Sequence, residues 1–145
     1  MEIKKVKTNK SVSLNKSTIN RINSFSLLND LDFSGKLETM SLDYIAIIEH
    51  SMKEIKDTFT NDEIEILINA CNMLILHTDK ISPAFLIHNA IVMYSSHFEC
   101  IVPEAMEFKI LNLTTAQSYA LLRALQSFWI DKDYSKLEII IKKKE

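Results

Sequence analysis

The first regular pattern in the chain is an alternation of apolar and polar residues near the N-terminus. Val12 and Leu14 alternate with Ser11 and Ser13. A period of two is typical of a short strand with one buried face. The pattern therefore predicts a strand over residues 10–15. An edge strand or extended arm attached to a helical body is the alternative to a paired strand.

After this segment the apolar period lengthens to that of a helix. Residues 15–18, Asn15-Lys16-Ser17-Thr18, form the expected N-cap region of a helix, and apolar residues at helical spacing follow it. We expect this helix to end within residues 30–34, with Gly35 as the stop or turn residue. A second helix is expected to begin within residues 39–41 and to reach residue 57, with a wide apolar stripe.

Four further helices are predicted by the residues that begin them. Thr60 and Glu63 fit a capping box, in which each side chain bonds to the backbone N–H of the other residue. Ser or Thr before a helix and Pro at its start are further signals. The other three starts carry such signals: Ser82 with Pro83, Pro103, and Thr114 or Thr115.

The C-terminal segment over residues 137–144 fits two structures. Its β-branched isoleucines and its three lysines favour a protected edge strand over a frayed helix. Taken together, the patterns predict a mainly α fold, with a short N-terminal β-strand followed by about six helices. We expect two parts, a strand-helix-helix head over residues 1–57 and a helical body over residues 58–145.

The composition favours helices and excludes several other classes. The 145 residues include one glycine and two prolines, too few for a turn-rich β-sandwich or a Gly-rich phosphate loop. With 47% hydrophobic and 25% charged residues, the chain is not disordered throughout. No stretch approaches the roughly 20 apolar residues of a membrane span. Cys71 and Cys100 are predicted to be buried free thiols, which suits a reducing cytoplasm.

The charges are distributed unevenly along the chain. Residues 1–29 carry six basic and one acidic side chain, whereas residues 30–145 carry eleven basic and eighteen acidic ones. The net charges are therefore +5 and −7. A basic head suggests contact with a polyanion, and an acidic body suggests a different role. A solvated basic tail without a partner is the simpler alternative.

Three segments of the head follow the order strand, helix, turn and helix: residues 10–15, residues 17–28 and residues 39–49. In this order the head resembles the ribbon-helix-helix family of DNA-binding proteins. The resemblance implies a homodimer, whose paired strands enter the major groove and contact base edges with polar side chains. It also implies that the N-terminus of the second helix holds a phosphate.

The charge pattern and this resemblance together predict ten residues that contact nucleic acid. Basic side chains are expected to meet phosphates, and Ser and Asn side chains of the ribbon are expected to contact bases. Hydroxyl groups near the start of the second helix are expected to bind a phosphate. The ten residues are Lys5, Lys7, Asn9, Lys10, Ser11, Ser13, Asn15, Arg21, Thr39 and Ser41.

In the body, residues 59–72 and 113–129 are similar to parts of a small all-helical module of bacterial proteins. That resemblance implies a helical fold without an assigned chemistry. The four histidines lie on different segments without metal-ligand spacing, and no nucleophile, base and orienting residue stand together. We therefore predict that the chain is not an enzyme and holds neither a metal nor a cofactor.

Two classes of function remain from these observations, with a third behind them. The first is a homodimeric DNA-binding regulator or accessory protein that contacts double-stranded DNA through its head. The alternative is a non-enzymatic protein-interaction module, an inhibitor or adaptor of a phage- or plasmid-type system, which binds its partner through the acidic body. A regulator that binds a small molecule is the third.

Overall fold

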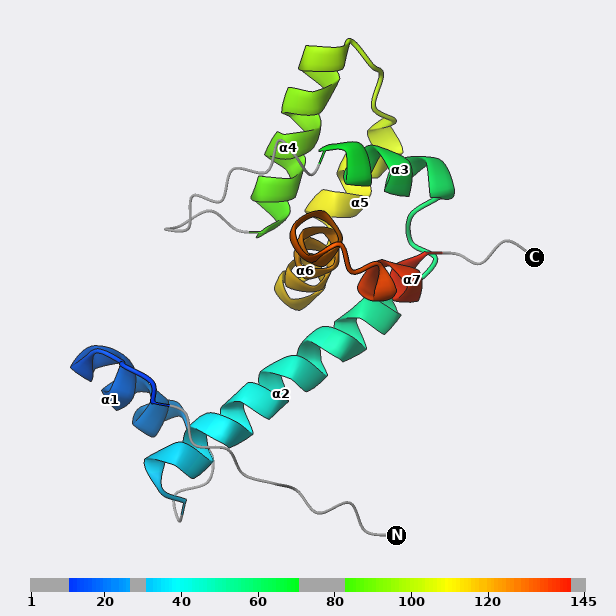
Figure 1. The fold of residues 1–145 in the computed structure, drawn as a ribbon. Coiled ribbons are helices and arrows are strands. Elements are labelled where there is room, and N and C mark those ends of the chain that lie inside the picture. Colours follow the sequence, from blue (N-terminus) through cyan, green and yellow to red (C-terminus); the bar gives the residue numbers. More distant parts are fainter. Residues whose placement is uncertain (1–10, 27–30, 71–82, 142–145) are drawn as a thin grey trace, which may run out of the picture. The chain divides into compact units, whose positions relative to one another are not determined.

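The computed structural model describes residues 11–26, 31–70 and 83–141, which form seven helices and no strand. Figure 1 shows these elements along the chain. They are α1 (Lys16–Phe25), α2 (Phe33–Glu54), α3 (Asn61–Ala70), α4 (Pro83–Phe98), α5 (Glu104–Leu111), α6 (Thr115–Asp131) and α7 (Ser135–Ile140). The mainly α part of the predicted fold class is therefore confirmed.

The predicted N-terminal β-strand is wrong for the residues that the structure describes. Residues 11–15 are irregular, and the Val12 side chain is 63% exposed. A strand needs a neighbour that accepts and donates its backbone hydrogen bonds. The described part of the chain contains no second strand, and two apolar side chains, Val12 and Leu14, bury too little surface to replace one.

The chain divides into two compact units, Met1–Asp43 and Tyr44–Glu145, and the division falls within α2. The expected boundary lay further along, between residues 57 and 58. The C-terminal half of α2 belongs to the helical body because its side chains Ile48 and Met52 are part of the body's core.

In the first unit, α1 begins where the sequence predicts and ends earlier. The Asn15 side chain accepts a hydrogen bond from the Thr18 N–H at 2.8 Å, so the N-cap lies within the predicted region, at its first residue. The helix ends at Phe25, before the expected range of residues 30–34. None of its residues is buried.

The start of α2 corrects two predictions. The carboxylate of Asp32 accepts a hydrogen bond from the Gly35 N–H at 2.8 Å, and the next N–H bonds to the Asp32 carbonyl. Asp32 therefore satisfies N–H groups at the start of the helix, as an N-cap does. Gly35 lies in the first turn of α2 and does not end a helix. The expected start of this helix within residues 39–41 is wrong for the same reason.

One core holds the second unit together. Helix α4 packs against α3, α5 and α6, and α6 also packs against α7, as Figure 1 shows in a view nearly along α6. The buried apolar side chains come from all six helices of the unit and from the turn between α2 and α3. They are Ile48, Met52, Ile55, Phe59, Ile64, Leu67, Ala70, Ile87, Ala90, Ile91, Met106, Ile110, Ala120, Leu121, Leu122, Ala124, Leu125, Leu137 and Ile140.

The N-terminal signals of the body are confirmed wherever the structure describes them. The Thr60 hydroxyl accepts from the Glu63 N–H, and the Glu63 carboxylate accepts from the Thr60 N–H, both at 3.2 Å. Thr114 forms the same reciprocal pair with Gln117 at the start of α6. Pro83 is the first residue of α4, and Pro103 directly precedes α5.

The preference for a C-terminal strand is wrong, because residues 135–140 form helix α7. The carboxylate of Asp133 accepts from the Ser135 N–H at 3.0 Å and so supports the start of the helix. Leu137 and Ile140, three residues apart, are both fully buried. Burial of this one helical face outweighs the strand preference of the β-branched residues.

Candidate functional site

An apolar groove of about 650 Å³ lies in the second unit, between α2, α6 and α7. We call it the α2–α6–α7 groove. Its apolar lining consists of Tyr44, Ile45, Ile48 and Met52 from α2, Tyr119 and Leu122 from α6, and Ile139 from α7. Its polar lining consists of Glu49, Lys53, Arg123, Gln126 and Lys136.

The spacing of the lining residues explains why they share one surface. On α6, Tyr119, Leu122, Arg123 and Gln126 follow the i, i+3, i+4, i+7 pattern that forms one face of a helix. On α7, residues 136 and 139 are likewise three apart. Each wall of the groove is therefore a single helical face, held in place by the core behind it.

The floor of the groove is buried and its walls are open to solvent. Ile48, Met52 and Leu122 are buried and belong to the core cluster. The four apolar side chains of the walls, Tyr44, Ile45, Tyr119 and Ile139, are between 37% and 55% exposed. Apolar walls that remain this exposed around a buried floor are typical of a binding surface rather than of core packing.

The charged side chains of the lining differ in how far they are already paired. Lys136 lies 3.4 Å from the carboxylate of Asp133. Within the described residues, Lys53, Arg123 and Glu49 form no ion pair closer than 4.0 Å. Both Lys53 and Arg123 are exposed. The groove thus presents two free cations beside an apolar floor.

Asp133 lies in the turn between α6 and α7, next to the groove residue Lys136. Hydrogen bonds from the Ser135 hydroxyl and N–H, with a smaller contribution from Lys136, hold the pKa of Asp133 below its ordinary value. The oxygen that accepts both Ser135 bonds lies 2.6 Å from the hydroxyl and 3.0 Å from the nitrogen. This turn fixes the start of α7 and with it the position of Lys136.

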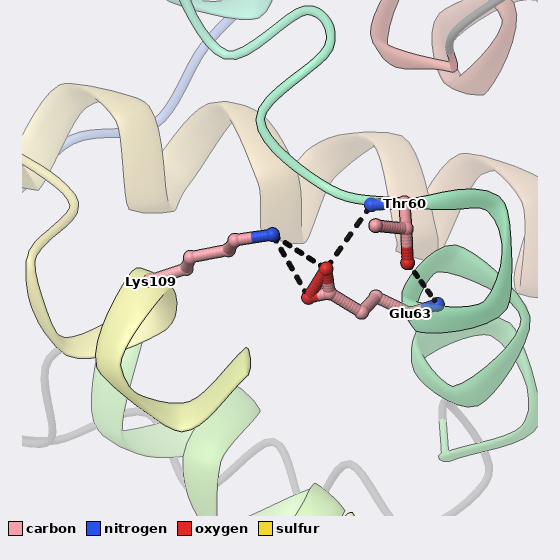
Figure 2. A network of polar contacts seen from close by, with 3 residues as sticks. All are labelled: Thr60, Glu63 and Lys109. Atoms are coloured by element: carbon pink, nitrogen blue, oxygen red, sulfur yellow. Dashed lines mark hydrogen bonds and ion pairs between the residues drawn. The ribbon is translucent and has the colours of Figure 1, made fainter. Parts of the chain in front are cut away.

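A second polar cluster, shown in Figure 2, joins α3 to α5. The Lys109 ammonium donates to both carboxylate oxygens of Glu63, at 2.5 and 3.2 Å. The Glu63 side chain is nearly buried, and Lys109 also lies 5.9 Å from the centre of the Phe59 ring. Since Glu63 also caps Thr60, each of its oxygens has a donor. The cluster holds α3 and α5 together and is not a reactive site.

The predicted nucleic-acid residues are spread over several kinds of position. Lys5, Lys7, Asn9 and Lys10 lie outside the described residues. Ser11 and Ser13 are exposed in the irregular segment before α1, and Arg21 is exposed on α1. The Asn15 side chain is used as the cap of α1.

Thr39 and Ser41 lie inside α2 and not at its N-terminus. The helix begins at Phe33, so the N–H groups near these residues belong to the helical interior. The Ser41 hydroxyl donates to the Leu37 carbonyl at 2.7 Å. The structure therefore does not bring these two hydroxyls to a helix N-terminus, where a phosphate was expected.

The described residues offer no cluster of three or more metal-ligating side chains. The Nε2 atom of His88 lies 3.6 Å from a carboxylate oxygen of Glu107, and that of His50 lies 3.9 Å from one of Glu54. Cys100 is a partly buried free thiol. His77 and Cys71 lie outside the described residues. None of the helices that the structure describes combines the length and the hydropathy needed to cross a bilayer.

The chain was compared with protein-family models, with curated proteins and with solved structures, and none of them matches it.

Sequence patterns alone missed the groove, although α6 carries a signal for it. Its core face is formed by Ala120, Leu121, Ala124 and Leu125, which already gives the helix a complete apolar stripe. Leu122, at the edge of the core, and the half-exposed Tyr119 extend the apolar surface beyond that stripe. When the apolar surface of a helix is wider than the core covers, the sequence indicates a second contact surface.

Proposed function

We propose that this chain is a non-enzymatic protein-interaction module, which binds a helix of a protein partner in the α2–α6–α7 groove. The observation that carries the proposal is the buried apolar floor between half-exposed apolar walls. Binding of an amphipathic helix in an apolar groove is a common recognition mode, in which anchors at i, i+3 or i+4 and i+7 fill the groove.

The shape of the groove favours a macromolecular partner over a small ligand. A small-molecule site usually covers most of its ligand's surface. Here the wall residues, such as Tyr44 and Tyr119, remain about half exposed, so the groove is open to solvent. A helix can cover both walls at once and bury the exposed apolar surface, which is favourable by about 25 cal/mol per Å².

The test uses the full chain and a displayed library of helical peptides with randomised surface positions. We expect enriched peptides to carry apolar anchors at i, i+3 or i+4 and i+7, and to lose binding to the Ile45→Asp variant. The matched control is Ile47→Asp on the same helix, because Ile47 is 54% exposed and does not line the groove. Equal loss of binding in both variants, or no enrichment, would overturn the proposal.

We propose DNA contact by the head as a second function, supported by its charge. Residues 1–29 carry a net charge of +5, and α1 holds Lys16 and Arg21 but no acidic residue. This proposal needs only phosphate contacts from basic side chains and does not use a ribbon.

Salt dependence of duplex DNA binding tests this second function. Each lost phosphate contact should reduce the log–log slope of affinity against salt by about 0.9. Lys16→Ala and Arg21→Ala should each lower the slope, whereas Lys56→Ala, an exposed lysine of the second unit, should not. Absence of binding at low salt would exclude the function.

A further inference from the structure

We infer that the helix bound by the α2–α6–α7 groove is acidic, with carboxylates beside its apolar anchors, and that Arg123 and Lys53 select for it. This inference rests on the proposed function, since it names the chemistry of the partner for the same groove. Two observations support it. The lining of the groove is basic, and two of its cations form no ion pair with the described residues.

The groove is a basic site on an acidic part of the chain. Its lining holds three cations, Lys53, Arg123 and Lys136, and one anion, Glu49. Residues 30–145 as a whole hold eleven basic and eighteen acidic side chains. Basic charge is therefore concentrated at the groove against the general charge of the surrounding surface, which would attract an acidic partner and repel a basic one.

Two of these cations are available to a partner. Lys136 is already paired with Asp133, whereas Arg123 and Lys53 form no ion pair with the described residues. Arg123 and Lys53 line the same groove as the floor residues Leu122 and Met52. Each free cation therefore stands beside the apolar floor. A guanidinium can bind a carboxylate through two parallel hydrogen bonds.

The charge of the groove argues against a second copy of this chain that docks groove to groove, because Lys53, Arg123 and Lys136 would then face the same three cations. The exposed helix α1 of a second copy, which carries Lys16 and Arg21 without an acidic residue, would also bring like charge to the groove. A short fatty acid could supply a carboxylate, but it would leave the half-exposed walls Tyr44 and Tyr119 largely uncovered. An acidic amphipathic helix satisfies both the walls and the cations.

The experiment compares three designed helical peptides against the full chain by fluorescence anisotropy. All three carry leucines at i, i+4 and i+7, and the positions flanking the leucines are glutamate, glutamine or lysine. We expect the glutamate peptide to bind about three- to tenfold more tightly than the glutamine peptide, and the lysine peptide to bind most weakly. The preference should shrink as salt is raised.

Charge reversal in the protein should first remove and then reverse the preference. Arg123→Glu and Lys53→Glu should each reduce the advantage of the glutamate peptide, and the double variant, whose groove lining holds three anions and one cation, should favour the lysine peptide. Lys56→Glu is the control, because Lys56 is exposed on the same unit and does not line the groove. Circular dichroism melting of each variant verifies that it folds, which is expected for exposed side chains.

The outcomes separate this inference from the proposed function. If all three peptides bind equally and lose binding in Ile45→Asp, the groove binds helices but the acidic preference is wrong. If no peptide binds, or if Ile45→Asp does not reduce binding, the helix-binding function itself is wrong. Sedimentation that shows self-association abolished by Ile45→Asp would assign the groove to a second copy, and dodecanoate binding that excludes the peptides would assign it to a small amphiphile. Either result would overturn the inference.

Discussion

At the scale of single residues, local pairs were predictable and distant ones were not. The Thr60–Glu63 capping box follows from a spacing of three residues, and the structure confirms it. The partner of Glu63 on α5, Lys109, is 46 residues away, and no local pattern points to it. A nearly buried carboxylate needs an opposite charge or several donors, so its presence alone implies a partner without naming it.

Removal of either partner from this ion pair should destabilise the second unit. Glu63→Ala removes the cap of Thr60 and leaves Lys109 unpaired, and we expect a loss of about 2–3 kcal/mol in the free energy of unfolding. Lys109→Met should also destabilise, because Glu63 is nearly buried and keeps only its cap bond. Urea unfolding of Glu63→Ala, Lys109→Met and the double variant gives the coupling energy. Additive effects would show that the pair contributes nothing.

The carboxyl of Asp133 should titrate below the ordinary Asp value of about 3.9. Its lowered pKa arises first from the Ser135 hydrogen bonds and less from Lys136. A lowered native pKa stabilises the fold at pH values above the ordinary one, and this contribution is lost as pH falls through the native pKa. An NMR titration of the side-chain carboxyl measures the pKa directly. Ser135→Ala should raise it more than Lys136→Ala does, and the reverse order would contradict the assignment.

At the scale of helices, starts were easier to predict than ends or strand preferences. Asn15, Thr60 and Thr114 act as predicted caps because their hydrogen bonds depend only on neighbours in the chain. The start of α2 was missed for two reasons. Asp32 also fits a turn, and a glycine such as Gly35 usually follows the end of a helix. The C-terminal segment was predicted as a strand but forms helix α7. Its structure is decided by burial against α6, which no local sequence pattern shows.

Burial of α7 should make Leu137 its most sensitive residue. Leu137→Ala removes a fully buried side chain, and we expect a loss of about 2–5 kcal/mol in the free energy of unfolding. The neighbouring Ile139→Ala is the matched control, because Ile139 is 37% exposed in the wall of the groove and should cost clearly less. Thermal or urea unfolding compares the two. Similar losses would contradict a helix with Leu137 on its buried face.

At the scale of the whole molecule, α2 contributes to two separate tasks. Its C-terminal half places Ile48 and Met52 in the core while Tyr44 and Ile45 line the groove wall. The apolar stripe of this helix was predictable from its spacing. The division of that stripe between core and groove was not, because it depends on how far α6 and α7 cover it. The core of the helical body therefore includes residues that the sequence pattern assigned to the head.

Two fragments test where the folded body begins. A fragment over residues 44–145 retains Ile48, Met52 and Ile55, which are all buried in the core of the second unit. A fragment over residues 56–145 lacks all three. Because each large buried side chain contributes about 2–5 kcal/mol, their combined loss approaches the whole stability of a typical domain, about 5–15 kcal/mol.

We therefore expect the longer fragment to unfold cooperatively in urea and the shorter one to show little or no cooperative transition. Circular dichroism at 222 nm follows both transitions, and a triple variant of the longer fragment, Ile48→Ala, Met52→Ala and Ile55→Ala, is the control for chain length. This variant should behave like the shorter fragment, since only buried apolar contacts are removed. Equal midpoints for the two fragments would show instead that the body folds without α2, as the boundary at residues 57 and 58 implies.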